Sequence, residues 1–303
     1  MALFSGMQEM IGETPLVELV HVNQEIPSRI YAKLELYNPS GSVKDRVGRA
    51  MLEDAERRGL LKPGSTIVEG TAGNTGLGIA FAALGKGYRV IFVVPDKFSV
   101  EKQALLRALG AEVVNTPRED GMLGAERKAD ELLQEIPGAI SFHQFKNPAN
   151  PRSHYETTGP EIYRDMEGEI DYFVAGAGSG GTFSGIAKYL KEKNPDIKAV
   201  LADPEGSTIG GGEHHDYDIE GIGNDFVADT MDISLVDKVI KITDEEAKRG
   251  VRELAKKEGI IAGSSSGAAY IAARKLSEEV GDAKIVVVLP DRGDRYFSTG
   301  LWD

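Results

Sequence analysis

The sequence predicts an α/β protein made of two packed three-layer units, each with a mainly parallel sheet between helices. Short β-rich runs alternate with amphipathic stretches along the whole chain, which is typical of this class. Several runs are apolar at consecutive positions, as at 90–94 and 285–289, and such strands are usually covered on both faces. The length of 303 residues is sufficient for two domains.

The expected elements alternate in chain order. The strands are expected at 30–36, 66–69, 89–94, 112–115, 171–175, 198–202, 238–242 and 284–289. The helices are expected at 44–58, 74–84, 100–109, 122–135, 182–193, 244–258 and 265–280. Strands and helices in this order predict parallel pairing through right-handed crossovers.

A polar stretch at 144–160 marks the expected boundary between the two units. It contains the segment Asn147-Pro148-Ala149-Asn150-Pro151 and separates halves of similar length. We therefore expect one α/β domain over 1–147 and a second over 148–303. The cleft between them is the expected ligand site.

Composition excludes several classes of function. The net charge of −13 disfavours non-specific binding to nucleic acid or anionic lipid. The absence of cysteine excludes disulfides, thiolate catalysis and cysteine-ligated metal sites. No apolar run approaches the ~20 residues of a membrane-spanning helix, and the first residues lack the features of a secretory signal. We expect a cytoplasmic protein with no metal, nucleic-acid or membrane partner.

Three glycine-rich turns stand where an expected strand gives way to an expected helix. They lie at 69–76, 176–182 and 263–267. Such a turn directs backbone N–H groups toward an anion, and the following helix N-terminus adds about half a positive charge. One turn alone could be no more than a tight turn with a helix cap. Three of them at the carboxyl ends of strands favour a binding site for phosphate or carboxylate.

The turn at 176–182 also allows a second interpretation. Gly176, Gly178 and Gly181 match the pattern G-x-G-x-x-G after a strand. Asp203 follows at the end of the next strand, so a dinucleotide site is an alternative. The same glycines and hydroxyls would suit a single phosphate monoester equally well.

The turn at 263–267 matches the pattern G-x-S-x-G with Ser265 at its centre. A hydrolase with this motif carries its catalytic histidine after the serine, whereas all five histidines of this chain precede it. We therefore predict that Ser265 caps a helix or contacts a ligand. A nucleotide-binding Walker A loop is excluded because no G-K-[ST] follows any of the turns.

Lys44 stands at the start of the expected helix at 44–58. The positive end of the helix dipole disfavours an ammonium there and lowers its pKa, as a Schiff-base amine requires. The alternative is a surface lysine with a solvated tip. The S-x-x-K pattern of acyl transfer is absent, since Gly41 occupies the serine position.

Four motifs in this order resemble the pyridoxal-phosphate-dependent cysteine synthase and cystathionine β-synthase family. They are Ser42-Val43-Lys44-Asp45-Arg46 and the segments 71–76, 178–182 and 263–267. The resemblance runs from 11–16 to 290–293. It implies the fold type II of these enzymes, similar to that of the tryptophan synthase β subunit. It also implies the short bacterial form, which has neither a haem segment nor a regulatory module.

The resemblance implies a β-replacement reaction with pyridoxal 5′-phosphate as cofactor. O-acetyl-L-serine or L-serine would react through an α-aminoacrylate, and homocysteine or sulfide would then give cystathionine or cysteine. The segments 203–207 and 220–226 look like cystathionine β-synthases, whereas 147–151 and 157–161 look like cysteine synthases. The resemblance also implies a homodimer that acts on small molecules.

Other functions remain as alternatives. A serine or threonine dehydratase would perform the elimination alone. A silent binding partner would need neither Lys44, Asn74 nor Ser265, and all three are present. A nucleotide-dependent dehydrogenase would leave Lys44 and two of the three turns unexplained.

The resemblance implies a role for each site residue. Lys44 would form the Schiff base and move the Cα proton. Asn74 would bond the 3′-oxygen of the cofactor, and Ser265 would face its pyridine nitrogen. The residues expected to bind the phosphate are Gly178, Ser179, Gly180, Gly181 and Thr182. Those expected to line the substrate site are Thr71, Ala72, Gly73, Asn74, Thr75, Gln144 and Gly221.

We also expect the substrate loop, at 71–75, to move during the reaction. The smaller domain, with its first ~40 residues packed on the larger one, would close with this loop and exclude water from the cleft. Ala72 stands where many cysteine synthases have serine, which removes a hydroxyl from the loop. The larger domain would hold the phosphate.

Overall fold

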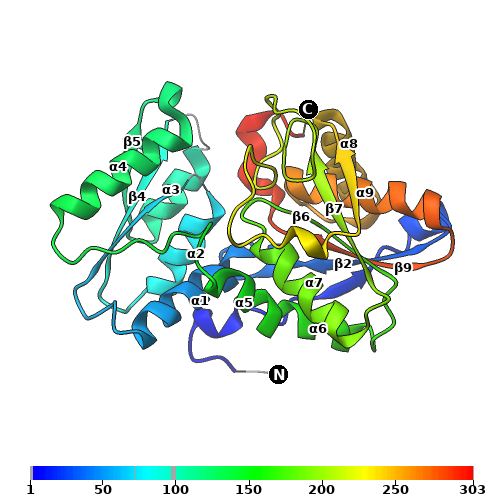
Figure 1. The fold of residues 1–303 in the computed structure, drawn as a ribbon, viewed down its shortest axis with the longest axis horizontal. Helices are drawn as coiled ribbons and strands as arrows, with labels where there is room; N and C mark the ends of the chain where they lie inside the picture. Colours follow the sequence, from blue (N-terminus) through cyan, green and yellow to red (C-terminus); the bar gives the residue numbers. More distant parts are fainter. Residues whose placement is uncertain (1–2, 72, 97–99, 303) are drawn as a thin grey trace.

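The computed structural model describes residues 3–71, 73–96 and 100–302, which contain two sheets in separate halves of the molecule (Figure 1). In spatial order, the six-stranded sheet contains β1 (Leu16–Glu18), β2 (Arg29–Leu34), β9 (Lys284–Leu289), β6 (Tyr172–Gly176), β7 (Lys198–Pro204) and β8 (Lys238–Ile242). The three-stranded sheet contains β3 (Thr66–Gly70), β4 (Arg89–Pro95) and β5 (Glu112–Thr116). Every pairing is parallel except that of β1 with β2.

Helices cover the sheets. They are α1 (Lys44–Arg57), α2 (Asn74–Ala83), α3 (Val100–Ala108), α4 (Gly121–Glu135), α5 (Ala149–Glu156), α6 (Thr158–Asp165), α7 (Gly181–Lys193), α8 (Asp244–Glu258) and α9 (Ser264–Val280). In Figure 1, α3 and α4 accompany the three-stranded sheet, α6 to α9 accompany the six-stranded sheet, and α1 and α5 lie between the two halves. Among the described residues, no helix has both the length and the apolar character needed to cross a bilayer.

The predicted fold class is confirmed. The strand β9 shows why a run of consecutive apolar residues indicated this class. Ile285 and Val287 pack in one core with α9, whereas Val286 and Val288 pack in another with α7. All four side chains are at most 2% exposed. A strand buried on both faces needs apolar residues at consecutive positions, as the sequence has them.

Most of the polar stretch at 144–160 is helical, from Ala149 onward, which the sequence pattern did not predict. Its helices α5 and α6 follow one another, and α5 packs against α1 and α7. Asn150 and His154 of α5 are fully buried. Asn150 donates to Ser179, and His154 lies 2.9 Å from the hydroxyl of Thr158. Buried polar groups that pair with one another leave no apolar pattern in the sequence.

The first strands of the chain belong to the six-stranded sheet. β2 pairs with β9 in parallel, from Arg29 beside Lys284 to Leu34 beside Leu289. The short antiparallel strand β1 lies at the edge and was also missed by the sequence analysis. The expected strand at 30–36 ends at Leu34 because Glu35–Tyr37 turns as a 3₁₀ helix.

Candidate active site

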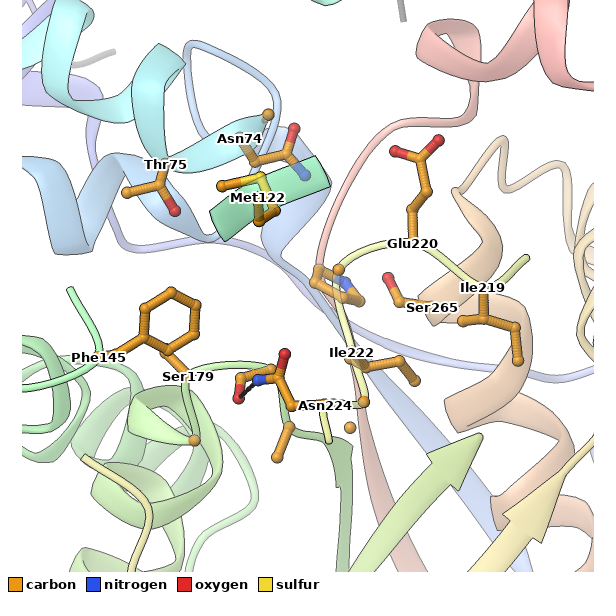
Figure 2. Close-up of a pocket in the computed structure, with 18 of the residues that line it drawn as sticks. Asn74, Thr75, Met122, Phe145, Ser179, Ile219, Glu220, Ile222, Asn224 and Ser265 are labelled. Carbon is orange, nitrogen blue, oxygen red and sulfur yellow. Dashed lines mark hydrogen bonds between the residues drawn. The ribbon is translucent and has the colours of Figure 1, made fainter. Parts of the chain in front are cut away.

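A cavity of about 800 Å³ lies at the carboxyl ends of β6 and β9 and extends to the loop before α2 (Figure 2). Its walls come from both halves of the molecule. They include the starts of α1, α2 and α9, the turn before α7, and the loop at 214–226. Carboxyl ends of parallel strands are the usual place for a ligand in such a fold.

Most of the predicted site residues meet in this cavity. Its lining includes Lys44, Thr71, Gly73, Asn74, Thr75, Gln144, Gly178, Ser179, Gly180, Thr182, Gly221 and Ser265. Gly181 is the first residue of α7, directly beside this lining. Ala72 lies outside the described residues.

Lys44 is the first residue of α1 and is half-buried at the cavity wall. Loss of water around the side chain lowers the pKa of Lys44 to about 8, and the negative charge of Asp291 partly opposes this. The sequence also predicts a lowered pKa, but it attributes the shift to the helix dipole, whereas the main cause in the structure is desolvation. The turn before Lys44 is held against the end of β9 by a backbone bridge between Ser42 and Asp291.

The lowered pKa of Lys44 predicts its reactivity toward acylating reagents. In the cofactor-free protein, acetylation of Lys44 by acetic anhydride should rise with pH through about 8 and then level off, because only the neutral amine attacks. Peptide mass spectrometry across pH 6–11 measures this profile. An inflection near the ordinary lysine value of ~10.4 would contradict the assignment.

The turn before α7 requires its glycines. Gly180 has a φ of +81°, and a Cβ on it would lie 2.3 Å from the Cβ of Met231. A Cβ on Gly181 would lie 2.1 Å from Oδ1 of Asn150. Among the described residues, no side chain caps the N-terminus of α7. Its first N–H groups are therefore available to an anion.

Buried polar groups hold this turn in place. Asn150 donates to Oγ of Ser179 at 2.9 Å, and Thr230 donates to the carbonyl of Ser179 at 2.5 Å. Nε2 of His154 lies 3.2 Å from Oγ1 of Thr182. Burial lowers the pKa of His154 to about 3, so its ring is neutral near pH 7. The two hydroxyls of the turn are thus oriented by partners from α5.

The loop before α2 forms the opposite side of the cavity. Thr75 donates from Oγ1 to Oε1 of Gln144 at 2.7 Å, which joins two predicted substrate residues. A Cβ on Gly78 of α2 would lie 2.1 Å from the carbonyl oxygen of Lys44. The glycine therefore allows α2 to approach the first turn of α1.

Asp291 and Tyr296 are further cavity neighbours that the sequence analysis did not single out. Oδ2 of Asp291 accepts from Nδ2 of Asn74 at 2.7 Å and from the hydroxyl of Tyr296 at 2.5 Å. Arg295 donates to Oδ1 of Asn74 at 2.6 Å, so both ends of this amide are held. The position of Asp291 two residues after the end of β9 is the signal that could have indicated it.

Lys102 and Glu220 were missed as well. They form an ion pair of 2.6 Å between α3 and the loop at 214–226, and both line the cavity. No pattern in the sequence indicates this pair, because its members are far apart along the chain.

The residues present fit a phosphorylated aldehyde with an aromatic ring. An amine of lowered pKa suits its carbonyl carbon, and the uncapped start of α7 suits its phosphate. Ser265 offers a neutral hydroxyl in the same cavity. Fold and cavity together define a pyridoxal-phosphate enzyme. A family model described as "Pyridoxal-phosphate dependent enzyme" matches residues 7–291, and the chain belongs to that family.

Similar proteins cover 98–100% of the chain. An O-acetylserine dependent cystathionine beta-synthase of Bacillus subtilis is 48% identical over 100% of this chain and 99% of its own. A cysteine synthase of Staphylococcus aureus strain Mu50 is 48% identical over 98% and 96%. The crystal structure of an O-acetylserine dependent cystathionine beta-synthase from Helicobacter pylori has a TM-score of 0.95 and 44% identity, covering 100% of both chains.

The comparisons confirm the predicted family, fold type and cofactor. Another similar structure, a hydrogen sulfide-producing enzyme from Fusobacterium nucleatum, has a TM-score of 0.94 and 39% identity. It covers 97% of this chain and 100% of its own. The family match sets aside the dinucleotide alternative for the turn at 176–182.

Proposed function

We propose that this enzyme catalyses β-replacement on O-acetyl-L-serine or L-serine, with homocysteine giving cystathionine or sulfide giving cysteine. The observation that carries the proposal is the meeting of Lys44, the substrate loop and the uncapped start of α7 in one cavity. The names of the relatives support it, since they include cystathionine beta-synthase and cysteine synthase at 48% identity.

The cofactor is held by residues from both halves in this proposal. Lys44 binds its carbonyl carbon, Asn74 its 3′-oxygen, and Ser265 its ring nitrogen. Its phosphate is bound by Gly178, Ser179, Gly180, Gly181 and Thr182. When bound, the cofactor supplies an electron sink for the charge left as Cα of the substrate loses its proton. A neutral hydroxyl at the ring nitrogen weakens that sink and favours loss of the β-substituent.

The remaining steps belong to residues of this chain. Lys44 would accept the proton from Cα once the amino group of the substrate has replaced its amine at the carbonyl carbon. The lowered pKa of about 8 increases the neutral fraction of the freed amine near pH 7. The substrate carboxylate is bound by Thr71, Ala72, Gly73, Asn74, Thr75 and Gln144, with Gly221 at the wall. Among these, Ala72 is proposed on its motif alone. Closure of the half that carries β3 to β5 excludes water during the reaction.

We further propose a homodimer located in the cytoplasm. Near the start of the chain, four large apolar side chains are exposed, by 43% or more, and would be covered by a second copy. They are Leu3, Phe4, Met7 and Met10.

Absorbance of the purified holoenzyme, combined with an assay for acetate, tests the proposed reaction. Addition of O-acetylserine should shift the visible band of the bound cofactor and release acetate, and homocysteine or sulfide should restore the band. The thiol that restores it faster is the preferred nucleophile. Absence of acetate release would reject β-replacement. Steady release of pyruvate without a thiol would favour the dehydratase alternative.

A further inference from the structure

Two buried polar side chains of α5 contact the hydroxyls of the turn before α7. Asn150 and His154 are both 0% exposed. Nδ2 of Asn150 lies 2.9 Å from Oγ of Ser179. Nε2 of His154 lies 3.2 Å from Oγ1 of Thr182. A hydroxyl has one hydrogen to donate and can also accept, so the direction of each bond decides whether that hydrogen remains available to a ligand in the cavity.

The direction of the first bond is fixed by a second contact of the Asn150 amide. Nδ2 also lies 3.0 Å from the backbone carbonyl oxygen of Gln144, which can only accept. The nitrogen therefore faces both atoms and donates to Ser179, whose own hydrogen is left for the cavity that it lines (Figure 2). Among the described residues, Oδ1 of Asn150 is buried without a donor, which is unfavourable. An apolar side chain would avoid this cost, so stability alone does not explain the amide.

Counting hydrogens gives the direction of the second bond. Burial lowers the pKa of His154 to about 3, so its ring is neutral near pH 7, with one nitrogen that donates and one that accepts. Nδ1 lies 2.9 Å from Oγ1 of Thr158, which is 0% exposed and has no other side-chain partner in the described part of the chain. The hydrogen of this buried hydroxyl needs an acceptor, and Nδ1 is the one within reach. Nε2 therefore carries the ring hydrogen and donates to Oγ1 of Thr182, whose own hydrogen is left for the cavity.

We propose that Asn150 and His154 are positioning residues that make the turn before α7 a pure donor site for an anion. The inference rests on the proposed function, in which this turn binds the cofactor phosphate. The hydroxyls of Ser179 and Thr182 then donate in addition to the N–H groups at the uncapped start of α7. A fully ionised phosphate ester offers only acceptors, so every donor of the turn finds a partner in it.

The ratio of two affinities isolates this effect. Pyridoxal has a hydroxymethyl group where pyridoxal phosphate has its phosphate ester, so the ratio of their dissociation constants for the cofactor-free full-length chain measures what the phosphate contributes. The carboxylate of Asn150→Asp can only accept and takes the hydrogen of Ser179, so it should lower this ratio about 10- to 100-fold.

A matched control separates the direction of the bond from the added charge. Asn194→Asp adds the same charge at the other end of α7. Its carboxylate can still accept from the N–H of Asp196, as Oδ1 of Asn194 does. Absorbance titration with both ligands should give the parent ratio for this control.

Uncharged variants and one spectrum complete the test. Asn150→Leu and His154→Leu each remove one donor without adding charge, and each should lower the ratio about tenfold. His154→Gln, whose amide nitrogen can replace Nε2 as a donor, should retain most of the parent ratio. Nitrogen-15 NMR of the histidine-labelled holoenzyme, which needs no variant, should show the ring hydrogen of His154 on Nε2.

Two results would overturn the inference. One is a ring hydrogen on Nδ1 of His154, and the other is an unchanged ratio in both leucine variants. Absence of acetate release from O-acetylserine would instead reject the proposed function, because the affinity ratios do not depend on turnover.

Discussion

Replacement of Lys44 by alanine is expected to lower the turnover of O-acetylserine at least ~10³-fold while leaving the fold intact. The change removes the amine that lies in the cavity with a pKa of about 8. It thereby removes both the proposed attachment point of the cofactor and the proposed base at Cα. Acetate release measures turnover, and far-ultraviolet circular dichroism measures the fold.

Two control variants separate the chemistry of Lys44 from its charge. Lys44→Arg keeps the positive charge but provides no neutral amine near pH 7, so it should be as inactive as the alanine variant. Lys86→Ala removes a lysine that pairs with Glu56 at the surface, and its turnover should stay at the parent level. Turnover of Lys44→Ala within tenfold of the parent would contradict the proposed role.

The second large effect is expected from Gly181→Ala. The added methyl group would lie 2.1 Å from Oδ1 and 2.4 Å from Cγ of Asn150. Asn150 is fully buried and donates to Ser179 and to the backbone of Gln144, so it has no room to withdraw. Overpacking of this kind costs about 1–3 kcal/mol, and here it displaces the turn proposed to bind the cofactor phosphate.

Cofactor affinity is the measurement that checks this variant. Titration of the cofactor-free protein should give a dissociation constant for pyridoxal phosphate that is about 5- to 150-fold higher than that of the parent. The rise in Tm on addition of cofactor should shrink accordingly. Gly6→Ala, outside the cavity, is the control. An unchanged dissociation constant for Gly181→Ala would show that the turn tolerates the methyl group or does not bind the phosphate.

Local signals explain the parts of the site that were predictable from the sequence. The turns at 69–76 and 176–182 join a strand to the start of a helix, as predicted. The expected turn at 263–267 follows no strand, because the chain runs from α8 to α9 and residues 264–267 form the first turn of α9. The structure brings all three segments to one cavity. The start of α1 at Lys44 was predicted because a turn at 38–43 separates it from the preceding strand. β6 and β9 are neighbours in one parallel sheet, so the residues that follow them meet at one edge. β3 belongs to the other sheet, and no local signal indicates that the turn after it joins them.

The parts that were not predictable depend on distant polar partners. Asn74 and Asp291 are 217 residues apart, and Lys102 and Glu220 are 118 apart. Nothing near any of these residues in the sequence specifies its partner. The burial of α5 was missed for a related reason, because its polar side chains are matched by α6 and by the turn before α7. Hydrophobic patterning does not detect burial of that kind.

The pairing of β2 with β9 sets an order for folding during synthesis. The partners of β3, β4 and β5 all lie within 66–116, so this sheet can assemble while the rest of the chain is still being made. β2 emerges from the ribosome early, yet one of its two neighbours begins at Lys284. Until then an apolar strand edge is left unpaired in the nascent chain, where it is open to aggregation and to chaperones. The six-stranded sheet is therefore the last of the two sheets to complete its strand pairing.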